Sequence, residues 1–250
     1  MRPPDEPDVS VVVPLKDEER NVIPLYEELV DVLEQSGIRH EIVLVDDGSL
    51  DATFDRAVEL HRRDPRVRVI RFSRNFGQTA AFAAGFAAAR GRYVITLDGD
   101  LQNDPGDIPR MLRLAPDYEV VCGWRRNRQD DLLTRKLPSV IANYLLGVVS
   151  GVRLHDNGCS LKVFRADIVK ALRLRPGMHR YLPALASQLG ARVTEVVVNH
   201  RPRRFGQSKY GLSRTFRVLA DVVRLRTLMK QATGAGEPAA PIYTVAARLG

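Results

Sequence analysis

The stretch Tyr93–Gln102, YVITLDGDLQ, joins an apolar run to two carboxylates that are separated by one residue. Tyr93–Leu97 has the length and β-rich composition of a buried strand, and Asp98-Gly99-Asp100 begins the loop at its carboxyl end. Open α/β sheets bind ligands at this end of their strands. Two carboxylates at this spacing can share Mg²⁺ or Mn²⁺ with oxygens of a diphosphate, and Gly99 would let the backbone turn. The alternative is a polar turn in which an aspartate caps the next segment.

Apolar strand patterns and helical periodicities alternate around this stretch. The pattern predicts strands over Val9–Val13, Glu41–Val45, Val67–Phe72, Tyr118–Val121, Ser160–Phe164 and Val193–Val198. It predicts helices over Asn21–Ser36, Asp51–Arg63, Phe76–Arg90, Asp107–Leu114, Ala166–Leu172 and His179–Leu189. Alternation of this kind indicates an α/β fold with a mostly parallel central sheet, right-handed crossovers and helices on both faces. The first half of the chain is typical of a nucleotide-binding layer.

The composition favours a folded protein with an anionic partner. Of the 250 residues 44% are hydrophobic, and the net charge is +8. Such a charge suits nucleic acid, a phosphorylated small molecule or an anionic membrane face. Two cysteines are too few for a disulfide framework or for a zinc site with paired spacing. The first ten residues lack the apolar core of a secretory signal, and Val140–Val152 is too short to span a bilayer, so we expect a cytoplasmic protein that is soluble or peripheral.

Seven segments in order carry a family resemblance. They are VSVVVPLKDEERN, EIVLVDDGSLD, FSRNFGQTAAFAAGF, ITLDGDLQNDP, VVCGWRRNR, DNGCSLKVFR and RFGQSKYG. Together they resemble family 2 glycosyltransferases of the GT-A fold, and more narrowly the polyprenyl-phosphate glycosyltransferases, which include dolichol-phosphate mannose synthases and undecaprenyl-phosphate sugar transferases. The resemblance runs from about Val9 to about Val223.

The resemblance implies a domain organisation. Residues 1–8 would be an N-terminal extension, and 9–211 the GT-A catalytic domain with a nucleotide half (9–123) and an acceptor half (124–211). Residues 212–231 would form an amphipathic juxtamembrane helix with an apolar stripe that suits packing or an anionic membrane. Residues 232–250, which include TGAGEPAAP, would be a flexible tail.

The family pattern also implies the residues that bind the nucleotide sugar. These are Pro14, Leu15, Glu18, Asp46, Asp47, Asn75, Gly77, Asp98, Gly99, Arg204, Ser208 and Lys209. The last three are matched to an R-x-x-G-x-S-K loop that would fold over the diphosphate. Lys16 and Asp17 stand where the pattern usually has Tyr and Asn, which removes an aromatic stacking partner and leaves the base undecided between uracil and guanine. A capped turn is the alternative for Asp46 and Asp47.

Metal and acceptor sites follow from the same pattern. Asp98, Asp100 and Gln102 match the D-x-D-x-Q motif that would bind Mg²⁺ or Mn²⁺ at the leaving diphosphate. The acceptor phosphate would be held by Arg125, Arg135 and Ser139. A solvated basic loop is the alternative for these residues.

The residues expected to act in catalysis are Asp156, Arg125, Arg135 and Lys209. Asp156 is either a general base or a positioning residue. We prefer positioning, because a phosphate monoester is mostly dianionic at pH 7 and needs little deprotonation. Lys162 is the expected salt-bridge partner of Asp156.

The implied activity is inverting, metal-dependent transfer of a hexosyl unit from a UDP- or GDP-sugar to a polyprenyl phosphate at the cytoplasmic membrane face. A membrane surface, and a membrane partner subunit, would then be partners, and nucleic acid would not. One alternative is a glycosyltransferase that acts on a soluble or cell-envelope glycan. Another is a non-catalytic basic module that binds nucleic acid or lipid, which the acidic D-x-D-x-Q motif argues against because it would repel a phosphate backbone.

Overall fold

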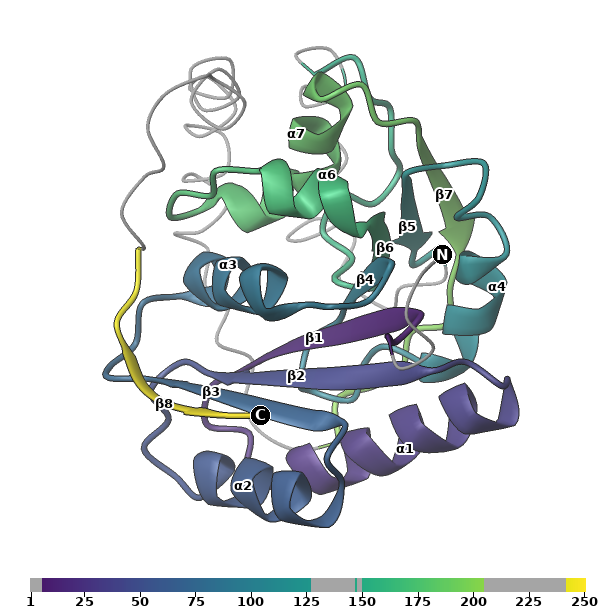
Figure 1. Cartoon of the computed structure of the whole chain (residues 1–250). Helices are drawn as coiled ribbons and strands as arrows, with labels where there is room; N and C mark the ends of the chain where they lie inside the picture. The colour runs from purple at the N-terminus through teal and green to yellow at the C-terminus, as the bar shows by residue number, and fades with distance from the viewer. Residues whose placement is uncertain (1–5, 127–146, 148–149, 205–241) are drawn as a thin grey trace.

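The computed structural model describes residues 6–126, 147, 150–204 and 242–250, and its described strands form one sheet of order β7-β5-β6-β4-β1-β2-β3-β8 (Figure 1). The strands are β1 (Val9–Leu15), β2 (His40–Asp46), β3 (Val67–Phe72), β4 (Tyr93–Thr96), β5 (Val120–Trp124), β6 (Lys162–Arg165), β7 (Val193–Val197) and β8 (Val245–Leu249). The helices are α1 (Val22–Gln35), α2 (Thr53–Arg63), α3 (Gln78–Ala88), α4 (Ile108–Leu112), α6 (Ala166–Ala171) and α7 (Leu182–Gln188), with 3-10 turns η1 (Pro105–Asp107) and η3 (Met178–Tyr181).

Four parallel strands make the centre of the sheet. Strands β4, β1, β2 and β3 pair in parallel, and every residue of β2 is buried. Near-continuous apolar runs are typical of strands that are covered on both faces. The predicted fold class, a mostly parallel sheet with helices on both faces, is confirmed. The carboxyl ends of these strands therefore lie at one edge, which is where ligands bind in such sheets.

Strand β6 runs against this direction. It lies between β4 and β5 and is antiparallel to both, whereas β5 and β7 are parallel to each other. Simple alternation of helices and strands did not predict this reversal. Because β6 is antiparallel, its amino end lies beside the carboxyl ends of β4 and β5, and Lys162 pairs with Thr96 on one side and Cys122 on the other.

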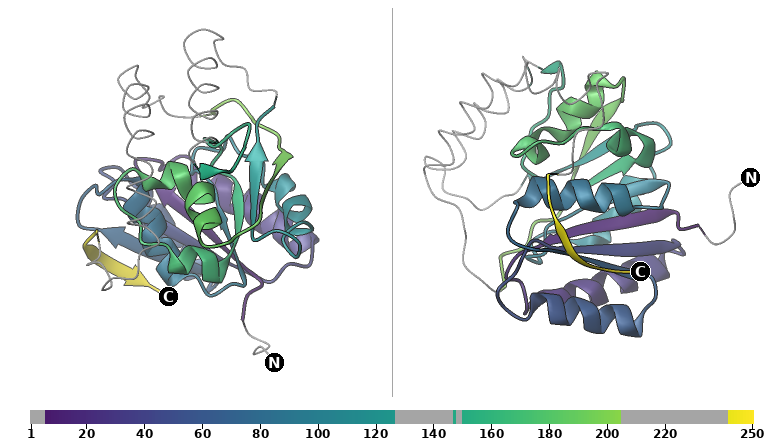
Figure 2. Two further views of the ribbon diagram at one scale, coloured as in Figure 1. Left: turned by 90° about the horizontal axis from the view of Figure 1, so that it is seen from above. Right: turned by 60° about the vertical axis from the view of Figure 1, so that its left-hand side comes forward.

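The sheet separates two apolar clusters. Val11 and Val13 of β1 pack with α1 and α2 residues on one face, while Val12 packs with α3 on the other. This is the alternation that a pleated strand imposes. Figure 2 shows the sheet between α3 and the α1–α2 pair, with α6 and α7 on the α3 side. The molecule thus has three layers.

The prediction of a flexible tail over residues 232–250 is wrong for its last residues. Residues Val245–Leu249 form β8, which pairs antiparallel with β3 at the sheet edge (Figure 1). Tyr243 stacks on Phe72 with ring centroids 4.8 Å apart, which brings the chain onto the sheet before the strand begins. The predicted helix over 212–231 lies outside the described residues. Within the described part of the chain, no helix has the length and hydropathy needed to cross a membrane.

Helix α3 lies close to β1 because Gly85 faces Val12. A Cβ added at Gly85 would overlap with Cγ1 of Val12. We expect Gly85→Ala to lower the free energy of unfolding by about 1–3 kcal/mol, because overpacking outweighs the gain in helix propensity of up to about 1 kcal/mol. Urea unfolding measures this loss. With Val12→Ala as the second change, the double variant should lose less than the sum of the two single variants; a stabilised Gly85→Ala would contradict the close packing.

Candidate active site

Polar side chains from five loops gather at the carboxyl edge of the sheet. The loops after β1, β2, β4 and β5 all leave from this edge, and the loop before β6 arrives there because that strand is antiparallel. The resulting group contains four buried aspartates. They are Asp46, Asp47, Asp100 and Asp156.

The turn after β2 is fixed by its two aspartates. Asp46 Oδ1 accepts the N–H of Ser49 at 3.0 Å, and Asp46 Oδ2 lies 3.4 Å from Arg71 Nε. Asp47 Oδ1 and Oδ2 accept the backbone N–H groups of Phe76 and Gly77 at 2.6 and 2.9 Å. Burial raises the pKa of Asp47, while these two hydrogen bonds act in the opposite direction. Asp47 therefore attaches the start of α3 to this turn, as well as lying where the sequence predicted a nucleoside contact.

Gly48 in the same turn has no substitute. Its φ is +66°, and an added Cβ would lie 2.5 Å from the carbonyl carbon of Arg74. Both the left-handed backbone and the close approach to the 74–75 backbone require glycine. The turn after β2 and the segment that contains Asn75 and Gly77 are thereby packed together, which brings these predicted nucleotide residues to one place.

The loop after β1 is joined to the same turn. Lys16 Nζ lies 3.0 Å from Asp17 Oδ1 and donates to the carbonyl oxygen of Gly48 at 3.0 Å. Asp17 has φ +52°, and its Oδ1 accepts the N–H of Leu50. The two residues that depart from the family pattern therefore connect the β1 and β2 loops. The carboxylate of Glu18, a predicted nucleoside contact, accepts from Asn21 Nδ2.

Pro14 and Leu15 belong to β1 rather than to a loop. Leu15 is buried, and its carbonyl oxygen accepts the N–H of Asp47 at 2.9 Å. An added Cβ at Gly99 would lie 2.6 Å from Cδ2 of Leu15. Leu15 thus sets the spacing between the turns that carry Asp47 and Asp98.

The D-G-D-L-Q turn bends at Leu101, not at Gly99. The φ angle of Leu101 is +62°, whereas the φ angle of Gly99 is not positive. A leucine in this region costs roughly 1–2 kcal/mol. Its side chain is almost fully buried in the α1–α2 cluster, and this burial offsets the cost. The expectation that Gly99 permits the turn is therefore wrong: Gly99 is required by its packing on Leu15.

Asp98 is held by neutral donors. Its Oδ1 accepts from Gln78 Nε2 at 2.6 Å. Loss of water raises the pKa of Asp98, and the charge of Asp100 raises it further; the Ser160 hydroxyl and the cations of Arg125 and Lys162 act against this. The two aspartates of the D-x-D-x-Q motif, Asp98 and Asp100, are therefore close enough for the charge of Asp100 to disfavour ionisation of Asp98.

The Arg203 guanidinium contacts both Asp100 and Gln102. Arg203 Nη2 is 2.6 Å from Asp100 Oδ2 and 3.5 Å from Gln102 Oε1. Both atoms are hard oxygen ligands of the kind that Mg²⁺ prefers, and a positively charged nitrogen already approaches both of them. These residues therefore fit a divalent cation. Across the described residues no three His, Cys, Asp or Glu side chains could hold a metal ion, so the remaining ligands would come from substrate oxygens and water.

The predicted role of Arg204 is not supported by its position. Arg204 Nη1 lies 3.8 Å from Glu28 Oε1 on α1, and its side chain is largely exposed. Arg203, which was not among the predicted site residues, is the arginine that contacts Asp100 and Gln102. It stands three residues before Gly206, so Arg203 and not Arg204 has the spacing of the R-x-x-G motif.

Arg125 and Asp156 form a buried ion pair. Asp156 Oδ2 accepts from Arg125 Nε at 2.7 Å and Oδ1 from Nη2 at 2.9 Å. The guanidinium holds the pKa of Asp156 below its usual range despite burial. The predicted salt bridge with Lys162 is wrong: Lys162 Nζ donates to the carbonyl oxygens of Asn157 and Cys159. Lys162 therefore bonds to the loop that carries Asp156, and it acts on the carboxylate only through its charge.

Four predicted site residues lie outside the described residues. They are Arg135, Ser139, Ser208 and Lys209. Their roles stay predictions.

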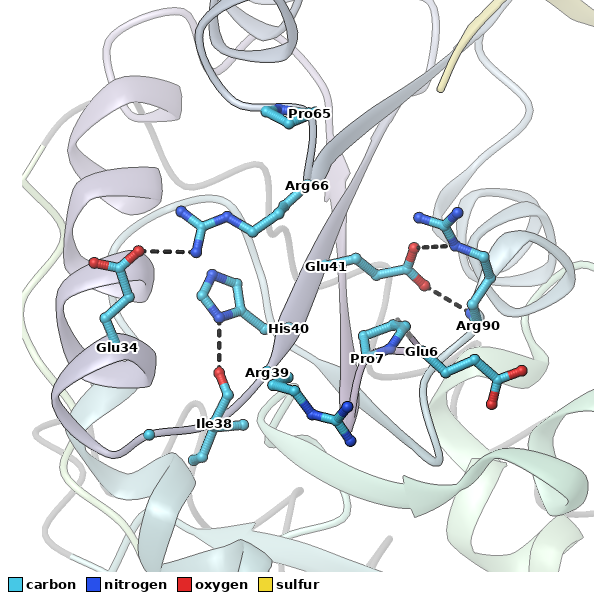
Figure 3. Close-up of a pocket in the computed structure, with 11 residues that line it drawn as sticks. Glu6, Pro7, Glu34, Ile38, Arg39, His40, Glu41, Pro65, Arg66 and Arg90 are labelled. Atoms are coloured by element: carbon cyan, nitrogen blue, oxygen red, sulfur yellow. Dashed lines mark hydrogen bonds and ion pairs between the residues drawn. The ribbon is translucent and has the colours of Figure 1, made fainter. Parts of the chain in front are cut away.

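A depression lies at the opposite edge of the sheet from the described site residues (Figure 3). It has a volume of about 570 Å³ and includes His40 and Glu41, which begin β2. Arg66 pairs with Glu34 at 2.8 Å and Arg90 with Glu41 at 2.8 Å. Because these opposite charges already neutralise each other, the depression has no charge preference for a phosphorylated ligand.

The Arg125–Asp156 pair predicts a pH-dependent loss of stability. Arg125→Met should lower the free energy of unfolding by about 3–5 kcal/mol at pH 7, because it leaves a buried carboxylate uncompensated. The pKa of Asp156 is lowered in the folded protein, so the pair stabilises above the unfolded pKa of about 3.9 and this contribution fades as pH falls. The deficit of Arg125→Met should therefore shrink towards pH 4. Urea unfolding at several pH values tests this, and Arg125→Met/Asp156→Asn should lose less than Arg125→Met alone; equal losses at every pH would contradict it.

Comparison with solved structures identifies the fold. Glucosyl-3-phosphoglycerate synthase from Mycobacterium tuberculosis, in complex with Mn²⁺, uridine diphosphate and glucosyl-3-phosphoglycerate, superposes with a TM-score of 0.64 at 18% identity, over 94% of this chain and 88% of that one. Mannosyl-3-phosphoglycerate synthase from Rubrobacter xylanophilus has a TM-score of 0.63 at 17% identity, over 94% and 79%. At such identities the likeness concerns the fold.

Sequence comparison identifies the family. Dodecaprenyl-phosphate galacturonate synthase from Rhizobium johnstonii is 46% identical over 228 residues, which is 89% of this chain and 68% of that protein. Undecaprenyl-phosphate 4-deoxy-4-formamido-L-arabinose transferase from Pseudomonas syringae is 40% identical over 223 residues, 88% of this chain and 65% of that protein. The chain thus spans about two thirds of these relatives. Because the Glycosyl transferase family 2 profile matches residues 10–173, the chain belongs to glycosyltransferase family 2.

Proposed function

We propose that the chain transfers a sugar from a nucleotide diphosphate sugar to a polyprenyl phosphate, with inversion at the anomeric carbon. The observation that carries the proposal is the placement of the Asp98–Gln102 turn and the buried Arg125–Asp156 pair at one sheet edge. The first is suited to a cation and diphosphate, and the second to an attacking phosphate. Both relatives named above act on polyprenyl phosphates.

In the proposed reaction, a phosphate oxygen of the acceptor attacks the anomeric carbon. The bond from that carbon to the diphosphate oxygen breaks, and its electron pair leaves with the nucleoside diphosphate. A divalent cation, when bound by Asp98, Asp100 and Gln102, would supply Lewis-acid stabilisation of this leaving group. Arg125 would hold the attacking phosphate, and Asp156 would keep the guanidinium in position. No covalent intermediate with the protein is required.

The sugar is proposed to be a hexuronic acid. The relative with 46% identity is a galacturonate synthase, and galacturonate is a hexosyl unit of the kind that the sequence resemblance implied. The relative with 40% identity transfers an arabinose derivative, which makes a pentosyl donor the natural comparison. Because a polyprenyl chain resides in a bilayer, the reaction would take place with the enzyme peripheral to a membrane face, and we propose the cytoplasmic face, where nucleotide sugars are made.

Asp100→Asn tests the proposed reaction. We expect it to lower kcat/KM by about 100-fold or more, since it removes charge from the leaving-group site. The assay follows lipid-extractable product from undecaprenyl phosphate in detergent, with UDP-galacturonate, UDP-L-arabinose, UDP-glucose and GDP-mannose in parallel, and with Mg²⁺ or Mn²⁺ against EDTA.

Asp117→Asn, an exposed carboxylate variant in the turn before β5, is the matched control and should keep wild-type turnover. Product with Asp100→Asn at the wild-type rate would contradict the proposed metal site. Consumption of donor only when a soluble glycan replaces the lipid would contradict the proposed acceptor.

The role of Asp156 can be read from a pH profile. As a positioning residue, Asp156→Asn should lower kcat/KM by about 10- to 100-fold, because misplacement of the reacting groups is costly. The acidic limb near pH 6, which reflects the second ionisation of the acceptor phosphate, should remain. If Asp156 were the general base, the variant would lose this limb. Profiles of kcat/KM from pH 5 to 8 distinguish the two roles.

A further inference from the structure

The guanidinium of Arg203 contacts two of the residues that are predicted to bind the metal ion. Its Nη2 is 2.6 Å from Asp100 Oδ2 and 3.5 Å from Gln102 Oε1. Asp100 is buried, and Arg203 is itself mostly shielded, with 21% of its side chain exposed. An ion pair in such surroundings is screened little by salt. The contact is therefore a strong one, and it involves two of the three predicted metal ligands.

Arg203 and a metal ion cannot occupy this place together. Mg²⁺ lies about 2.0–2.1 Å from its oxygen ligands. A cation bound to both Asp100 Oδ2 and Gln102 Oε1 would have to contact the same two atoms that Arg203 Nη2 already approaches, at 2.6 and 3.5 Å. The other oxygen of Asp100 accepts the N–H of Gln102 at 3.2 Å. Binding of the metal by these two residues thus requires the guanidinium to leave.

The chain before Arg203 is anchored independently of this contact. The N–H of Arg201 donates to the carbonyl oxygen of Gln102 at 2.9 Å. The Arg201 guanidinium pairs with Glu28 and Asp104 at 2.6 and 2.7 Å. His200 forms a β-bridge with Asn103. Because these bonds fix residues 200–201 against the D-x-D-x-Q turn, the side chain of Arg203 can be displaced while its backbone stays at the site.

We propose that Arg203 is a placeholder for the divalent cation: it neutralises Asp100 and orients Gln102 in the metal-free enzyme, and the metal must displace it. This inference rests on the proposed function for the identity of the metal site. It implies that Arg203 weakens metal binding to the nucleotide-free enzyme. A diphosphate offers the displaced guanidinium a new anionic partner, so nucleotide diphosphate and metal should bind cooperatively.

The test measures Mn²⁺ binding rather than turnover. Free Mn²⁺ is followed by electron paramagnetic resonance in titrations of the nucleotide-free protein and of the protein with UDP or GDP. Arg203→Gln keeps a polar side chain but removes the charge, and it should bind Mn²⁺ without nucleotide at least tenfold more tightly than wild type. The enhancement of Mn²⁺ affinity by the diphosphate should become smaller in this variant.

Three variants make the test specific. Arg203→Lys retains a positive charge and should stay closer to wild type than Arg203→Gln. Arg204→Gln removes an adjacent charge that pairs with Glu28, so it controls for net charge and should leave Mn²⁺ affinity unchanged. Asp100→Asn should abolish tight Mn²⁺ binding. Thermal unfolding of each variant shows whether the fold is retained.

Equal or weaker Mn²⁺ binding by folded Arg203→Gln would overturn the proposal. If neither the wild type nor this variant bound Mn²⁺, the proposed placeholder role of Arg203 would also be wrong, because no metal would displace its side chain. Turnover in EDTA in that case would leave the proposed transfer reaction standing, with Arg203 as its permanent cation. If Arg203→Gln bound Mn²⁺ with wild-type affinity and turnover still depended on metal, only the proposed displacement of Arg203 by the metal would be rejected. The two proposals can therefore fail separately.

Discussion

Burial of several carboxylates at one edge of the sheet is the constraint on which the site depends. Asp46, Asp47, Asp100 and Asp156 are all buried there. A buried carboxylate costs several kcal/mol unless hydrogen bonds or an opposite charge offset the loss of water. The sequence supplies these donors from distant parts of the chain: Arg71 near Asp46, the Phe76–Gly77 backbone at Asp47, Arg203 at Asp100 and Arg125 at Asp156. The edge is therefore held together by the compensation of its own charges.

Three aspartates at this edge, Asp47, Asp98 and Asp156, differ in the kind of donor that they accept from. Asp47 and Asp98 accept from neutral groups, and burial raises the pKa of both. Asp156 accepts from a guanidinium, and its pKa is lowered. A neutral donor fixes geometry and leaves the negative charge available to a ligand, whereas a guanidinium neutralises that charge until another cation replaces it. In the proposed reaction, this difference would separate an acid that orders the nucleotide loops from one that keeps an arginine in place for the acceptor phosphate.

The sequence predicted the central layer because its signals are local. Apolar runs and helical periodicity placed β1, β2, β3 and α1–α3 within a few residues, and the D-x-D-x-Q motif is found in the loop after β4 where it was expected. The features that the sequence did not predict depend on pairing between residues far apart in the chain. Nothing local shows that β6 is antiparallel, and the Gly- and Pro-containing segment before residue 242 concealed that Val245–Leu249 completes the sheet. The partner of Asp156 is Arg125, 31 residues away, rather than the nearby Lys162.

The state of Asp156 bears on what attacks the sugar. A hydroxyl nucleophile needs a base to take its proton, and an efficient base has a pKa near the working pH. Asp156 has both oxygens bonded to Arg125 and a lowered pKa, which argues for the proposed positioning role over that of a base. A phosphate nucleophile is already ionised and needs orientation and charge neutralisation, which a buried guanidinium provides. The reversal of β6 brings this pair to the carboxyl edge of a parallel sheet, and this placement supports the proposed phosphate acceptor over a hydroxyl acceptor.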